Sequence, residues 1–149
     1  MTIKSFRGLI ADGDQTTIVL HTNDGSTGYR IVKFEILPFT PGDVNQDSCV
    51  QVWKVSQTLP TVQTIDFSEQ TLLGAAMYGS DAGTYSNNDI RAVIFDSEIF
   101  NQDIYVTHQN TSGSEPINYY IELEQVKLDL GENTVATLKD IRNITAITG

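Results

Sequence analysis

The sequence predicts an all-β domain, an antiparallel β-sandwich or jelly-roll-like fold of about seven or eight strands with one short helix. Residues 119–130 alternate between apolar and polar side chains with the period of two that marks a half-buried strand. Other short runs rich in Val, Ile and aromatic residues are separated by clusters of Gly, Pro, Asn and Asp at spacings of roughly ten residues. These spacings favour an antiparallel sandwich over a parallel α/β fold.

The start of the chain is predicted to form two hairpins. Residues 3–10 and 16–22 are the first two strands, and a Gly-bearing turn at residues 11–14 separates them. The second strand is followed by Asp24-Gly25, which supplies the positive φ of a tight hairpin turn.

Five further strands are expected at residues 29–37, 49–57, 90–99, 103–108 and 119–130. In the first of these, Val32, Phe34 and Ile36 share one face, and Pro38 ends the strand. In the last, the apolar positions change parity, from Tyr119, Ile121 and Leu123 to Val126, Leu128 and Leu130. We therefore expect a β-bulge at Glu124 and Gln125.

The short helix is predicted over residues 68–78, because helix formers follow a candidate N-cap at Asp66 or Ser68 and Gly79 stands at the end. The polar, Gly-rich loop at residues 79–89 is expected to be a partner-contacting tip. Tyr78 and Tyr85 are its expected anchors, because Tyr combines apolar area with a hydrogen bond.

The C-terminal end differs from the rest. Residues 1–134 are expected to form the sandwich and residues 135–149 a C-terminal arm or last strand. Apolar residues recur here at every third position from Val135, namely Leu138, Ile141, Ile144 and Ile147. This spacing turns by about 60° per step on an α-helix, so one straight helix cannot hold them on one face. They form either a last strand with a frayed end or an apolar arm that contacts a neighbouring subunit.

Composition excludes several classes of function. The 149 residues fit one domain with a real core, and no apolar run is long enough to span a bilayer or to serve as a signal peptide. Nine basic against nineteen acidic residues give a net charge of -10, which repels nucleic acid and anionic lipid alike. We expect synthesis in the cytoplasm and no nucleic-acid or membrane partner.

The candidate metal and catalytic motifs are incomplete. Asp43, Asn45 and Asp47 match the first ligands of a calcium loop, but Ser48 and Lys54 stand where Gly and Glu are needed, so no metal is predicted. His21 and His108 lie in no nucleophile arrangement, and Cys49 is expected to be a buried thiol. Glu122 and Glu124 are expected on a solvated strand face, opposite Ile121 and Leu123. We predict no catalytic residue, no cofactor and no enzyme activity.

Long stretches resemble small proteins encoded by tailed phages of marine bacteria. They are Arg7-Gly8, HTNDGSTGYRIVKF at residues 21–34, FDSEIFNQDIYVT at 95–107, NYYIELEQVKL at 118–128 and TVATLKDIRN at 134–143. The resemblance implies a virion component and assigns no catalytic residue.

The expected function is therefore that of a capsid decoration or cement protein on the outer shell. Its partners would be the phage major capsid protein or other virion subunits, and a homo-oligomer is expected. Two alternatives remain open. A tail-associated adaptor, tube or knob subunit would use the same sandwich, whereas a carbohydrate-binding module would need exposed aromatics such as Trp53 with Tyr119 or Tyr120. Trp53 lies between Val52 and Val55 and is expected in the core.

Overall fold

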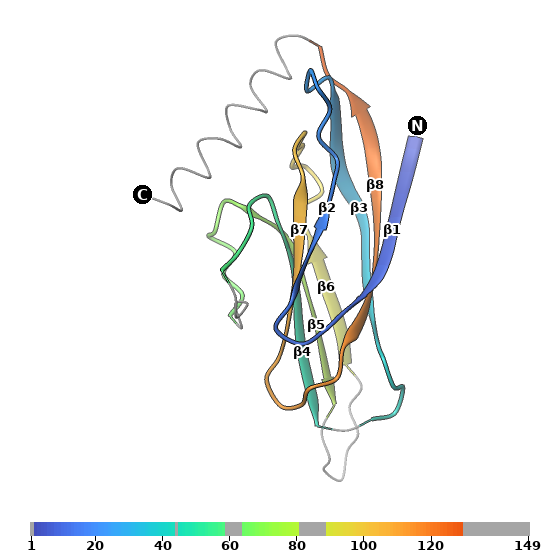
Figure 1. Cartoon of the computed structure of the whole chain (residues 1–149), viewed down its shortest axis with the longest axis vertical. Helices are drawn as coiled ribbons and strands as arrows, with labels where there is room; N and C mark the ends of the chain where they lie inside the picture. Colours follow the sequence, from blue (N-terminus) through green and yellow to red (C-terminus); the bar gives the residue numbers. More distant parts are fainter. Residues whose placement is uncertain (1, 44, 59–63, 81–88, 130–149) are drawn as a thin grey trace.

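Eight strands in two antiparallel sheets form the fold (Figure 1). The structure is a computed structural model that describes residues 2–43, 45–58, 64–80 and 89–129, and it confirms the predicted all-β sandwich class. The strands are β1 (Thr2–Ile10), β2 (Gln15–Ile18), β3 (Thr27–Pro38), β4 (Gln46–Trp53), β5 (Leu72–Ser80), β6 (Asp89–Ile94), β7 (Ile104–Asn110) and β8 (Ile117–Lys127).

The strand order is that of a jelly roll with one strand displaced. Sheet A has the order β1-β8-β3, and sheet B has the order β2-β7-β4-β5-β6. The pairs β1–β8, β2–β7 and β4–β5 are those of one long antiparallel hairpin that has been rolled up into two sheets. β6 extends sheet B beside β5 instead of pairing with β3.

The two hairpins predicted at the start of the chain are wrong. β1 belongs to sheet A and β2 to sheet B, and β3 returns to sheet A, so both connections cross between sheets. The turn chemistry itself is as expected, because Gly13 and Gly25 have φ values of 77° and 68°. A left-handed glycine lets the chain reverse, but it does not determine which strand becomes the hydrogen-bonded partner.

The short helix predicted over residues 68–78 is also wrong, because Leu72–Ser80 is strand β5. The expected capping chemistry appears as a turn, in which the Asp66 side chain accepts hydrogen bonds from the backbone N–H (3.0 Å) and hydroxyl (2.6 Å) of Ser68. β5 lies between β4 and β6, and eight of its nine residues are buried or half-buried. A strand covered on both faces lacks the alternation of apolar and polar residues that identifies other strands.

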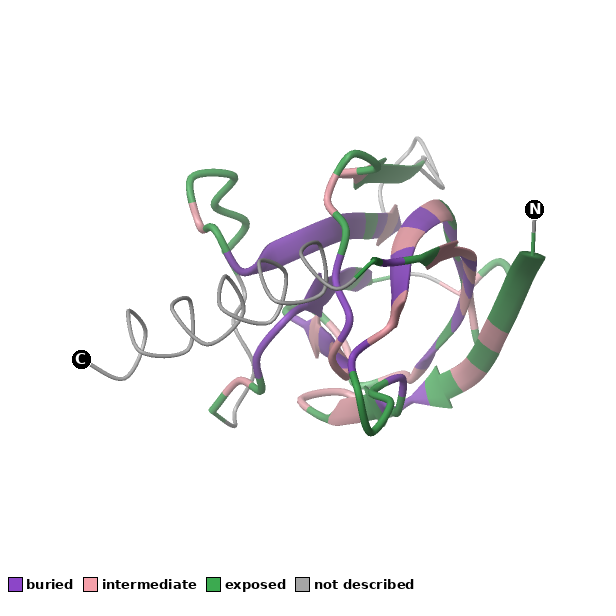
Figure 2. Cartoon of the chain, turned by 90° about the horizontal axis from the view of Figure 1, so that it is seen from above, coloured by how far each residue is buried: buried purple, intermediate pink, exposed green. Residues whose placement is uncertain are grey.

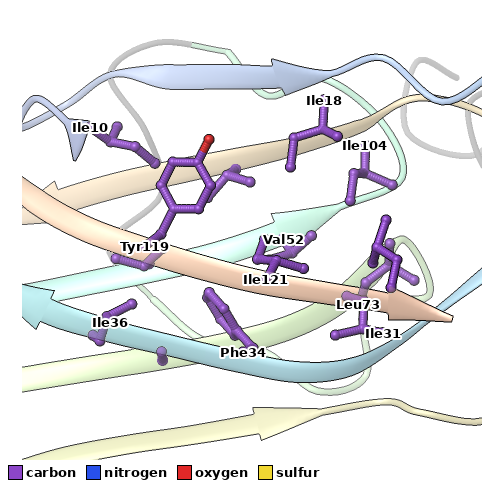
Figure 3. Packing of buried hydrophobic residues seen from close by; sticks show 14 of the residues in the cluster. Ile10, Ile18, Ile31, Phe34, Ile36, Val52, Leu73, Ile104, Tyr119 and Ile121 are labelled. Atoms are coloured by element: carbon purple, nitrogen blue, oxygen red, sulfur yellow. The ribbon is translucent and has the colours of Figure 1, made fainter. Parts of the chain in front are cut away.

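The core lies between the two sheets (Figure 3). Sheet A contributes residues such as Phe34, Ile36 and Ile121, and sheet B contributes Val52 and Ile104. Along β8 the buried positions are Ile117, Tyr119, Ile121 and Leu123, as the alternation predicted. Burying each such aliphatic side chain contributes about 1.5–3 kcal/mol.

The predicted bulge at Glu124 and Gln125 is not present, since β8 pairs with β1 without a register shift from Ile117 to Gln125. The bulge lies instead in the neighbouring strand β3, between Ile31 and Lys33. It displaces Val32, which is only half-buried, while Phe34 and Ile36 face the core as expected. Val126 therefore keeps the parity of Glu124 within β8, and Leu128 is buried just beyond the end of the strand.

Candidate functional site

The outer face of sheet B is covered by the protein itself over β4 and β7, whereas Met77 on β5 and Val93 on β6 are exposed. Gln51, Trp53 and Thr107 point to this face yet are buried. The chain that follows β4 crosses over them, because the Gln51 side-chain amide donates to the Thr64 carbonyl oxygen (3.0 Å). Trp53 donates its Nε1–H to Thr107 Oγ1 (3.0 Å). The prediction that Trp53 is buried is confirmed, and its ring is unavailable to a ligand.

The outer face of sheet A is open, and the strand register arranges it in four rows. β1, β8 and β3 contribute one residue each to a row, because alternate residues of paired strands point to the same side. The rows are Ile3–Glu124–Arg30, Ser5–Glu122–Lys33, Arg7–Tyr120–Glu35 and Leu9–Asn118–Leu37. Seen from above in Figure 2, β1 stands at the margin of the domain with mostly exposed and half-buried residues.

One half of this face consists of charged residues that bind one another. Arg30 Nε lies 2.6 Å from Glu124 Oε2, and the Tyr120 hydroxyl donates to Glu122 Oε1 (2.8 Å). The bond to Glu122 raises the pKa of Tyr120 above its usual value. Glu122 and Glu124 thus lie on the polar face, as expected. Glu124 holds Arg30 across the strands, and Glu122 holds Tyr120 along β8.

The other half is a groove of about 420 Å³, here called the sheet A groove. Its outward-facing residues are Arg7, Leu9, Glu35, Leu37, Asn118 and Tyr120. Leu9 is 49% exposed and Leu37 is 62% exposed. The Arg7 side chain forms no hydrogen bond or ion pair with any of the described residues. The groove therefore offers two apolar side chains, a guanidinium and the exposed Glu35 carboxylate to a partner.

Charge is distributed unevenly between sheet A and the rest of the molecule. The strands of sheet A carry five cations and three carboxylates, namely Lys4, Arg7, Arg30, Lys33 and Lys127 against Glu35, Glu122 and Glu124. The described residues hold sixteen Asp and Glu in all, so thirteen lie outside these strands, where the described cations are Lys54 and Arg91. The open face of sheet A is itself balanced, because Lys4 and Lys127 have the other parity, which leaves Arg7, Arg30 and Lys33 against Glu35, Glu122 and Glu124.

His21 and Asp103 form a His–Asp pair of the kind found in catalytic triads, with His21 Nδ1 2.7 Å from Asp103 Oδ1. The same carboxylate oxygen accepts the backbone N–H groups of Leu20 (2.9 Å) and His21 (3.0 Å). Partial burial raises the pKa of Asp103, but these hydrogen bonds outweigh it and the net pKa is lowered. Within the described part of the chain no hydroxyl or thiol is bonded to the imidazole. The pair anchors the end of β2 and lacks a nucleophile.

His108 and Cys49 are both buried. His108 Nδ1 lies 3.1 Å from the Ile10 carbonyl oxygen, and its Nε2 lies 3.0 Å from Ser48 Oγ. Burial lowers the pKa of His108, so the neutral ring ties the corner after β1 to sheet B. The prediction of a buried thiol is confirmed, and burial raises the pKa of Cys49 to about 11.

The residues that resemble a calcium loop have structural partners. The Asp43 carboxylate accepts from the Gln46 amide (3.3 Å), and the Asp47 carboxylate accepts from the Ser112 hydroxyl (2.7 Å). Lys54 is buried, with Nζ 3.3 Å from Glu98 Oε2. Over the described ranges, no three His, Cys, Asp or Glu residues gather in a way that could hold a metal ion.

The predicted partner contacts have a mixed outcome. Tyr78 is 2% exposed and belongs to the core, so we no longer propose it as an anchor. Tyr85, Leu138, Ile141, Ile144 and Ile147 lie outside the described residues, as does the whole arm at 135–149. The sheet A groove was not predicted, although Leu9 and Leu37 share the parity of the charged residues Arg7 and Glu35. Their shared parity with these charged residues is the sequence signal that places Leu9 and Leu37 on the outer face of sheet A.

No model of a known protein family matches this chain, and a search of curated proteins finds no match either. In the part of the chain that the structure describes, there is no helix with the length and apolar character needed to cross a bilayer.

Proposed function

We propose that this chain is a non-enzymatic structural protein of a phage virion, a capsid decoration or cement protein that binds the outer shell. The observation that carries the assembly role is the open face of sheet A, where Leu9 and Leu37 are exposed beside Arg7. Exposed apolar side chains next to charged groups are typical of protein–protein interfaces. The phage setting comes from the resemblance of residues 21–34, 95–107 and 118–128 to small phage proteins.

The remaining chemistry of the chain supports a binding role. His108 and Cys49 are enclosed in the fold, and the carboxylate of Asp103 is occupied by the backbone that it anchors. A decoration protein needs a stable sandwich and a contact surface instead of reactive groups. Many copies on one shell convert weak single contacts into strong retention.

The experiment is to locate and count the protein in purified particles of the phage that encodes it. Quantitative mass spectrometry should find many copies in a fixed ratio to the major capsid protein. Recombinant full-length chain should rebind to shells from which it has been stripped. Its absence from the particles would contradict the virion role, and a few copies at the tail vertex would favour the tail-associated alternative.

The C-terminal arm is the second contact that we propose for the shell. Deleting residues 138–149 removes Leu138, Ile141, Ile144 and Ile147 and should leave a folded domain that no longer decorates shells. Thermal denaturation checks the fold, and co-sedimentation with stripped shells checks the binding. Undiminished rebinding of the shortened chain would remove the arm from the proposal.

Carbohydrate binding remains a second candidate because one aromatic side chain, Tyr120, borders the sheet A groove beside Asn118, Arg7 and Glu35. Trp53 and Tyr119 are buried, so they cannot form the aromatic platform that this function was expected to use. Lys33 Nζ lies over the Tyr120 ring, 5.9 Å from its centroid, so the lysine covers part of the ring face that a sugar would stack on. Binding on a glycan array that is lost on Tyr120→Ala would favour this alternative.

A further inference from the structure

A second pocket, of about 500 Å³, opens at the seam between the two sheets, here called the seam pocket. β1 and β2 are the edge strands of sheets A and B at this seam, and they are hydrogen-bonded to β8 and β7 instead of to each other. Lys4 and Phe6, two inward-facing residues of β1, line one wall, and residues 19–22, which follow β2, line the other. Tyr29 of β3 completes the pocket.

The Tyr29 side chain lies in the core, but its hydroxyl has no hydrogen-bond partner. Tyr29 is 3% exposed, and its ring stacks on Phe100 with the ring centroids 6.4 Å apart. The hydroxyl bonds none of the described residues, and its oxygen keeps contact with solvent. A buried tyrosine normally finds a partner for its hydroxyl. The hydroxyl therefore opens into the seam pocket and is available to a ligand.

Lys4 brings a positive charge to the same place. It pairs with the core residue Leu123, so it has the inward parity of β1. Its ammonium lies over the Tyr29 ring, 5.8 Å from the centroid, and forms an ion pair with none of the described carboxylates. An inward lysine at a sheet edge discourages pairing with other chains. That role does not account for the free hydroxyl beside it.

We propose that the seam pocket binds a small organic monocarboxylate through the Lys4 ammonium and the Tyr29 hydroxyl. Both groups donate hydrogen bonds, and bonds to an ionised carboxylate are stronger than bonds to a neutral acceptor. Phe6 and Leu20 line the same pocket and contact the apolar body of the ligand. The seam pocket is separate from the sheet A groove, so this site stands whether or not the protein belongs to a virion.

The charges around the pocket favour a ligand with a single negative charge. The lining residue His21 has its Nδ1 2.7 Å from Asp103 Oδ1, and the lining residue Thr22 donates its hydroxyl to Asp24 (3.3 Å). Two carboxylates thus stand directly behind the wall formed by residues 19–22. They repel a dianion more strongly than a monoanion, and Lys4 compensates one charge.

The test titrates the isotope-labelled full-length chain with benzoate and follows the backbone amide signals by NMR. Benzamide is the neutral probe of the same shape, and phenyl phosphate is the dianionic probe. We expect benzoate to bind with a Kd of about 1 mM, as suits a ligand of this size, and to shift the signals of residues 4–6, 19–22 and 29. Benzamide and phenyl phosphate should bind at least about tenfold more weakly.

Two variants remove the proposed ligands of the carboxylate. Lys4→Gln and Tyr29→Phe should each weaken benzoate binding by about tenfold. Tyr29→Phe keeps the ring and loses no hydrogen bond to the described residues, so the fold should persist, and thermal denaturation checks this. Lys33→Gln is the matched control, because Lys33 also lies over a tyrosine ring, 5.9 Å from the centroid of Tyr120, but on the outer face of sheet A.

Several results would overturn the proposal. They are an absence of signal shifts at about 10 mM benzoate, binding of benzamide as tight as that of benzoate, undiminished binding by Lys4→Gln or Tyr29→Phe, and an equal loss in Lys33→Gln. Phenyl phosphate that binds as tightly as benzoate would overturn the assignment to a monocarboxylate.

Discussion

Replacing Gly8 by Ala should destabilise the domain, because this glycine lies directly under a core aromatic ring. Gly8 on β1 is paired with Tyr119 on β8. A Cβ at position 8 would stand 2.9 Å from Tyr119 Cε1 and 3.0 Å from its hydroxyl oxygen. Overpacking of this kind costs about 1–3 kcal/mol. Replacing Gly by Ala inside a strand recovers about 0.5–1 kcal/mol. We therefore expect a net loss of about 1 kcal/mol.

Urea denaturation measures this loss as a lower midpoint with an unchanged m-value. The melting temperature should fall by about 2 to 8 °C. The control is the same substitution in a Tyr119→Leu background, where the ring that would be displaced is absent and Gly8→Ala should stabilise the domain by about 0.5–1 kcal/mol. An equal cost in both backgrounds, or a more stable Gly8→Ala protein, would refute the reasoning.

Three further predictions concern titratable groups. Asp103→Asn should cost about 1 kcal/mol at neutral pH. The lowered pKa of Asp103 means that its contribution is present above the unfolded value of 3.8 and lost as the pH falls through the folded pKa, so the two stability curves should converge in acid. Curves that stay parallel down to acid pH would contradict this role for the carboxylate. His108 has a pKa lowered from 6.5, so the unfolded chain binds the proton first and the native protein should lose stability as the pH drops below that value. In His108→Gln the urea midpoint should change less with pH over the same interval. An identical pH dependence of the midpoint in both proteins would count against a buried neutral ring. Cys49, with a pKa of about 11, should resist alkylation in the native protein at pH 8 and react once urea unfolds it, as mass spectrometry would record. Rapid labelling of the native chain would mean that the thiol is accessible.

Strands with one solvated face could be predicted from the sequence. The alternation in residues 119–130 located β8, and the runs at 3–10 and 29–37 located β1 and β3 within two residues at each end. The same patterns place Leu9 and Leu37 outward, on the parity of Arg7 and Glu35. β5 was mistaken for a helix because both of its faces are covered and no alternation survives.

The candidate site is less accessible to sequence reasoning than its strands. The sheet A groove combines Leu9 and Leu37, which lie 28 positions apart in the sequence, on either side of Asn118. Only the register of β1 and β3 on β8 brings them into one row. Tyr78 shows the opposite error, since a tyrosine beside a polar loop was expected at the surface, whereas its position within strand β5 directs its side chain into the core.

By itself, the sequence determined that this protein is an acidic β-sandwich, that β8 presents Tyr119, Ile121 and Leu123 to the core, and that Gly13 and Gly25 reverse the chain. These features are local, because period-two patterning and glycine conformation depend on adjacent residues. Only the tertiary structure decided that β1 pairs with β8, that the bulge falls in β3, and that the open face of sheet A carries a groove. Strand pairing is set by the burial of distant segments against one another, and no local pattern encodes which distant segment is the partner.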